Sequence, residues 1–161
     1  MLGKTTNPML QQTEQAILQK IKPELKLPLE RTVAAGLQVM YGKPELLIQQ
    51  LSKSEDFAHN VGEGAAKLVG VLYGQSKKTM PVSIAVPAAT IFMCEGLDFL
   101  EKAGKVKVTP ELLAEATQDM GASVLQLFGI TQDKMREALA QKGAQPPDQA
   151  PPQGIIASQG A

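Results

Sequence analysis

Apolar residues recur at helical spacing through the first 143 residues, and Pro and Gly fall mostly where helices would begin or end. Between Leu112 and Leu127 the apolar side chains lie three or four positions apart, which is typical of a helix with one buried face. Alternation of polar and apolar residues is confined to the short stretch 105–108, which we interpret as a connector between two helices. The pattern therefore predicts an all-α fold.

Start and stop signals divide this pattern into a bundle of six or seven helices. Asn7, Ser54 and Thr109 are residue types that cap helix N-termini, and Gly42 suits the left-handed position just past a helix end. Pro87 lies inside an apolar helix, so we expect either a kink there or a later start near that residue. The expected helices cover residues 8–21, 29–41, 45–51, 54–73, 81–103, 110–128 and 131–143.

The last 18 residues differ in composition from the rest of the chain. Gln, Pro, Gly and Ala dominate residues 144–161, and Asp148 is their one charge. Such a segment buries too little apolar surface to offset its ordering entropy. We therefore predict a helical domain over 1–143 and a disordered Pro/Gln/Gly-rich tail over 144–161.

Composition narrows the classes of function. The 161 residues carry 16 basic and 16 acidic side chains, so no net charge steers the protein toward nucleic acid, and we expect no sequence-specific nucleic-acid partner. With one Cys and one His, neither a disulfide framework nor a zinc site is expected, and we predict no metal and no cofactor. The first eight residues lack the apolar stretch of a secretory signal, which predicts synthesis in the cytoplasm.

Residues with catalytic chemistry are few and incomplete as a set. His59, with Glu63 four positions later, could act as a general base or metal ligand, but a surface or packed histidine is favoured because one His and one carboxylate fall short of a complete site and the chain has no second His. Cys94 lies in an apolar stretch and is better interpreted as a small buried hydrophobe than as a nucleophile. The acidic pair Glu111 and Glu115 is typical of a solvated helix face. We therefore predict no catalytic residues and no enzymatic activity.

A glycine-rich stretch, residues 62–67, has neither the spacing nor the preceding strand of a phosphate-binding loop. Glycine inside a helix costs up to about 1 kcal/mol relative to alanine. We infer that this cost is offset by close helix packing along residues spaced by four, Gly62, Ala66 and Gly70.

The segment from Met80 to Met93 is apolar on several sides, with Lys77 and Lys78 before it and acidic residues from Glu95 onward. It is the central helix of the bundle, or neighbouring subunits cover it, or it is released into a bilayer; the sequence leaves these three open. The flanking lysines are better explained as a solvated rim than as membrane anchors. Candidate subunit- or membrane-facing residues are Met80, Val82, Ile84, Val86, Ile91, Phe92, Leu97 and Leu100.

Three parts of the chain carry a resemblance to a known class of proteins: residues 7–10 with the Gln-rich helix that follows, the centre from 72 to 101, and residues 108–114 with 127–131. Together they resemble small helical virion proteins of tailed bacteriophages, particularly the internal ejection proteins of short-tailed phages. The Gln/Pro-rich end, 151–156, is also similar to the tails of phage portal and virion proteins.

The resemblance implies a bacteriophage virion structural protein that is stored in the capsid and ejected with the genome. It would then form a homo-oligomeric channel in the host envelope for genome delivery. Its partners would be copies of itself, other virion proteins (portal, tail or ejection proteins) and a host membrane. One alternative is a head–tail adaptor or accessory virion protein packed against portal or tail subunits. A further alternative is a cytoplasmic helical scaffold or regulator.

Overall fold

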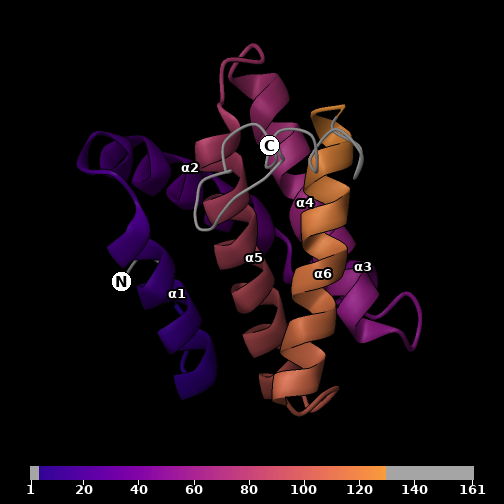
Figure 1. Cartoon of the computed structure of the whole chain (residues 1–161). Helices are drawn as coiled ribbons and strands as arrows, with labels where there is room; N and C mark the ends of the chain where they lie inside the picture. The colour runs from indigo at the N-terminus through magenta and orange to yellow at the C-terminus, as the bar shows by residue number, and fades with distance from the viewer. Residues whose placement is uncertain (1–3, 130–161) are drawn as a thin grey trace, which may run out of the picture. The chain divides into compact units, whose positions relative to one another are not determined.

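Six α-helices make up the part of the chain that a computed structural model describes, residues 4–129 (Figure 1). These residues contain no β-strand, so the predicted all-α class is confirmed. The predicted helix over 131–143 and the predicted tail over 144–161 lie outside the described residues. The helices are α1 (Pro8–Lys20), α2 (Pro23–Gly42), α3 (Pro44–Leu51), α4 (Phe57–Gln75), α5 (Val82–Lys102) and α6 (Pro110–Leu127).

Helix starts follow the capping rules, with one correction. Asn7 and Thr109 cap α1 and α6, accepting hydrogen bonds from backbone N–H groups at 2.9 and 3.1 Å, as the sequence predicts. The predicted cap at Ser54 is wrong. Its hydroxyl donates instead to the side chain of Asn60 at 2.9 Å, and Asp56 caps α4 two residues further along.

Two helices continue through an internal proline. Pro28 and Pro87 are each the sixth residue of their helix, where a missing N–H removes a single intrahelical hydrogen bond. Helix α2 therefore begins at Pro23, earlier than predicted, and the predicted later start of α5 near Pro87 is wrong. Gly42 is also not a left-handed stop, because it is the last helical residue of α2.

Helix α5 occupies the centre of the bundle and contacts all five other described helices (Figure 1). It is long and apolar enough to cross a membrane, but 72% of its most apolar 18-residue window is buried inside the protein. The ring of Phe92 on α5 lies directly against Gly36 on α2, where an added Cβ would be 2.1 Å from the ring. In this conformation the chain's own helices therefore surround the apolar segment.

The turn between α4 and α5 contains two consecutive residues in the left-handed conformation. Lys77 and Lys78 have φ angles of 57° and 63°. Their N–H groups donate to the carbonyls of Gly74 and Tyr73 at 3.0 and 2.9 Å. These bonds close the end of α4 and turn the chain toward α5.

Candidate functional site

Helix α5 carries three acidic residues, Glu95, Asp98 and Glu101, at three-residue spacing on one face. Glu95 is fully buried and Asp98 is 2% exposed. A buried carboxylate is costly unless hydrogen bonds or opposite charges compensate it. The site is defined by the groups that supply this compensation.

Most of these groups belong to residues 4–7, which precede α1. The backbone N–H of Lys4 donates to Glu95 Oε1. The N–H groups of Thr6 and Asn7 donate to Asp98 Oδ1 at 3.2 and 3.1 Å. These three hydrogen bonds use main-chain donors, so the bonds themselves do not require particular side chains at positions 4, 6 and 7.

Further bonds complete the contact around the other acidic side chains. Asp98 Oδ2 is 2.9 Å from Lys102 Nζ, which lies one turn further along α5. Glu101 accepts from Asn7 Nδ2 and from the Val108 N–H, both at 2.8 Å. We call residues 4–7 with Glu95, Asp98 and Glu101 the N-terminal clasp.

A fourth carboxyl group, that of Glu14 on α1, is buried next to the clasp and has no exposed surface. Its Oε1 accepts from Thr5 Oγ1 at 3.1 Å, whereas its Oε2 has no hydrogen-bond partner. Burial, and secondly the charge of Glu95, raises the pKa of Glu14 to about 7. Glu14 therefore exchanges its proton near neutral pH, inside the contact between α1 and α5.

Glu95 also joins α2 to this network, because the Tyr41 hydroxyl donates to Glu95 Oε2 at 2.9 Å. Burial, followed by the charge of Glu95, raises the pKa of Tyr41 above its usual range. Tyr41 therefore remains a hydrogen-bond donor across the physiological range of pH.

The residues singled out from the sequence lie elsewhere in the described part of the chain. Of the candidate subunit- or membrane-facing residues, Val82 and Val86 are partly exposed. The remaining six are buried under the chain's own helices: Met80, Ile84, Ile91, Phe92, Leu97 and Leu100.

The glycine-rich face of α4 lies against α6. At Gly62 an added Cβ would be 2.8 Å from the Met120 nitrogen and 2.9 Å from the Ala116 oxygen. Ala66 is buried, and a Cβ on Gly70 would be 3.3 Å from Leu127. Two helix backbones thus meet directly at Gly62.

Of the residues with catalytic chemistry, His59 lies at the surface beside two carboxylates, and Cys94 is buried. His59 is half exposed, with Nδ1 3.5 Å from Asp119 Oδ2 and Nε2 4.0 Å from Glu63 Oε2. Burial raises the pKa of the Cys94 thiol, which disfavours the reactive thiolate. Within residues 4–129 no group of three or more His, Cys, Asp or Glu side chains could hold a metal ion.

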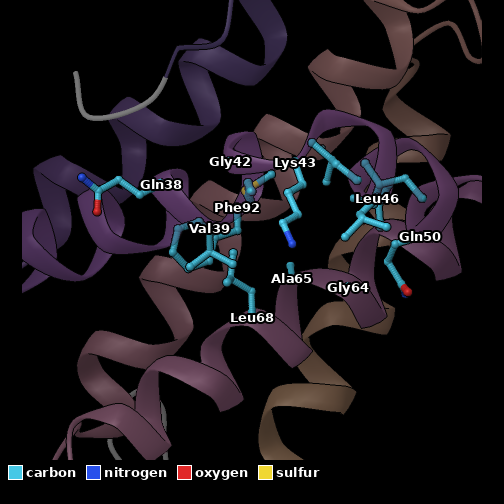
Figure 2. Close-up of a pocket in the computed structure, with 15 residues that line it drawn as sticks. Gln38, Val39, Gly42, Lys43, Leu46, Gln50, Gly64, Ala65, Leu68 and Phe92 are labelled. Carbon is cyan, nitrogen blue, oxygen red and sulfur yellow. The ribbon is translucent and has the colours of Figure 1, made fainter.

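A second feature is an apolar pocket of about 520 Å³ between α3 and the helices α2, α4 and α5 (Figure 2). We call it the α3 pocket. Side chains from α3 form one wall, and small residues of α4 and α5 form the facing wall. The pocket and the clasp involve different residues of α5.

Neither feature is among the sites predicted from the sequence. A usable signal for the clasp was the three-residue spacing of Glu95, Asp98 and Glu101 in an otherwise apolar helix, since buried acids require partners. Nothing comparable marks the α3 pocket, whose shape depends on how four helices pack. No family model, curated protein or solved structure matches this chain.

Proposed function

We propose that the protein is a non-catalytic structural protein of a bacteriophage particle, an internal protein that is ejected with the genome and forms a homo-oligomeric conduit in the host envelope. The observation that carries the proposal is how α5 is covered on its α1 side. Helix α1 packs principally against α5. Its own buried residues are Leu10 and Glu14, so apolar burial contributes little to holding it there.

A conduit protein must store an apolar helix in one place and expose it in another. The length and apolar character of α5 suit this role, and the N-terminal clasp is a cover that depends on hydrogen bonds and charge. Removing α1 would uncover part of α5 while leaving the α4–α6 contact intact. The released surface could then pack against other copies of the chain or against lipid.

Release of a dye from liposomes tests the membrane step. We expect the wild-type protein to release the dye and Asp98→Asn, which weakens the clasp, to release it faster. Glu115→Gln, an exposed change of the same kind on α6, serves as the control and should match the wild type. Intact liposomes with both the wild type and the Asp98→Asn variant would contradict the conduit.

A second candidate is the head–tail adaptor, which the burial of α5 among the described helices favours, because an adaptor does not have to expose this helix. The composition of phage particles before and after genome release separates the two candidates. An ejected protein disappears from emptied particles, whereas an adaptor stays with them.

A further inference from the structure

The α3 pocket exists because the helices facing α3 carry little side-chain volume. Gly64 and Ala65 on α4 and Gly96 on α5 line it. A Cβ on Gly64 would meet nothing closer than the Leu51 side chain at 3.6 Å. The volume of about 520 Å³ falls in the range of about 300–1,000 Å³ that is usual for small-molecule sites.

Two polar side chains that line the pocket, those of exposed Lys43 and of Gln50, carry N–H donors for which residues 4–129 supply no acceptor. Lys43 is the one charged residue among those lining it, and within residues 4–129 Lys43 forms no ion pair. Figure 2 shows its side chain extending over the space between Phe92 and Leu46, with the ammonium group directed into the pocket. Gln50 also lines the pocket, and its buried Nε2 has no hydrogen-bond partner.

The rim of the pocket is apolar. Val39 and Leu46 are each 52% exposed, which is high for large hydrophobic side chains. A ligand with an aliphatic chain would cover them and fill the apolar space below. A negatively charged head group would at the same time form an ion pair with Lys43.

We propose that the α3 pocket binds a medium-chain fatty acid. The aliphatic chain lies between α3 and the small residues of α4 and α5, and the carboxylate pairs with the Lys43 ammonium group. The binding proposal does not depend on whether the protein belongs to a virion, because the residues that line the pocket include none of the N-terminal clasp.

Isothermal titration calorimetry of the full-length protein with sodium decanoate tests the site directly. We expect saturable binding of one decanoate per chain. Decyltrimethylammonium has the same chain with the opposite charge, so it should bind at least tenfold more weakly. Equal affinity for the two amphiphiles, or no saturable binding of decanoate, would overturn the proposal.

Two variants separate the contribution of the ligand's charged head group from that of its aliphatic tail. Lys43→Met keeps the aliphatic stem and removes the charge, and we expect about tenfold weaker binding of decanoate with unchanged binding of decanol. Gly64→Leu fills the space between α3 and α4 and should abolish binding of both. Gly74→Leu is the matched control, because nothing lies within 4 Å of a Cβ on Gly74.

Thermal unfolding of each variant shows whether the variant folds. If Gly64→Leu does not fold, binding of decanoate by Lys43→Met tests the site by itself. Undiminished decanoate binding by Lys43→Met, or by folded Gly64→Leu, places the ligand elsewhere and overturns the proposal. Dimer formation through α3 that excludes decanoate would likewise assign the pocket to a protein partner and overturn it.

Discussion

The contact between α4 and α6 and the contact between α1 and α5 hold the bundle by different means. At Gly62 the backbones of α4 and α6 touch, and the contact depends on shape. Between α1 and α5 the decisive groups are the buried carboxylates of Glu14, Glu95 and Asp98 and their donors. The backbone contact at Gly62 involves no titratable group, whereas the contact between α1 and α5 changes with the protonation of Glu14. We call α4 and α6 the permanent pair, because their contact depends on shape, and α1 and α5 the conditional pair, because their contact depends on the protonation of Glu14.

The largest expected effect comes from disrupting the permanent pair. In Gly62→Ala the new Cβ would press on backbone atoms of α6, which cannot move without shifting that helix. We expect the free energy of unfolding, measured by urea denaturation, to fall by about 3 kcal/mol. In the same helix, Gly74→Ala meets open space and should gain up to about 1 kcal/mol from helix propensity. Equal stability of the two variants would refute the direct backbone contact.

The conditional pair responds to pH through Glu14. Because the folded chain raises its pKa from 4.5 to about 7, the folded state holds the proton more tightly than the unfolded state. The stabilisation is complete below about pH 4.5 and is lost as the pH rises to about 7. In Glu14→Gln the side chain at position 14 is neutral at every pH. This variant should be more stable than the wild type by up to about 3 kcal/mol at about pH 8. Near pH 4.5 the two should have similar stability.

Urea denaturation of the wild type and Glu14→Gln across this pH range checks the effect, with Glu115→Gln as the control for loss of an exposed carboxylate. Parallel stability curves for wild type and Glu14→Gln would show that Glu14 does not titrate inside the contact.

A smaller and more local effect is expected at the clasp itself. Asp98→Asn retains an oxygen for the N–H groups of Thr6 and Asn7 but loses the charge that strengthens those bonds and pairs with Lys102. We expect a loss of about 1–2 kcal/mol. Amide hydrogen exchange should accelerate at residues 6 and 7 and stay unchanged in α6. Uniform acceleration across both regions would mean that the two contacts open together.

Much of the fold could be predicted from the sequence because helix signals are local. Asn7 and Thr109 cap the helices they were expected to cap. The errors arose where one local rule competed with another. Pro28 and Pro87 indicate helix breaks, yet each helix continues through its proline at the cost of one intrahelical hydrogen bond.

The candidate site was less accessible to such reasoning because its parts are far apart in sequence. The donors of the clasp are backbone N–H groups of residues 4–7, which no side-chain pattern reveals, and they meet acids about ninety positions later. The burial of Glu14 could not be predicted for the same reason. Glu14 lies among polar residues of α1, and only the contact of α1 with α5 shows that its side chain is buried.

The left-handed turn at Lys77 and Lys78 carries a conformational cost. A side chain other than glycine costs roughly 1–2 kcal/mol in this conformation, so two in succession store energy in the link between α4 and α5. That energy is recovered if the link straightens. The hydrogen bonds of the turn and the packing of α4 and α5 must therefore outweigh this conformational cost in the folded protein.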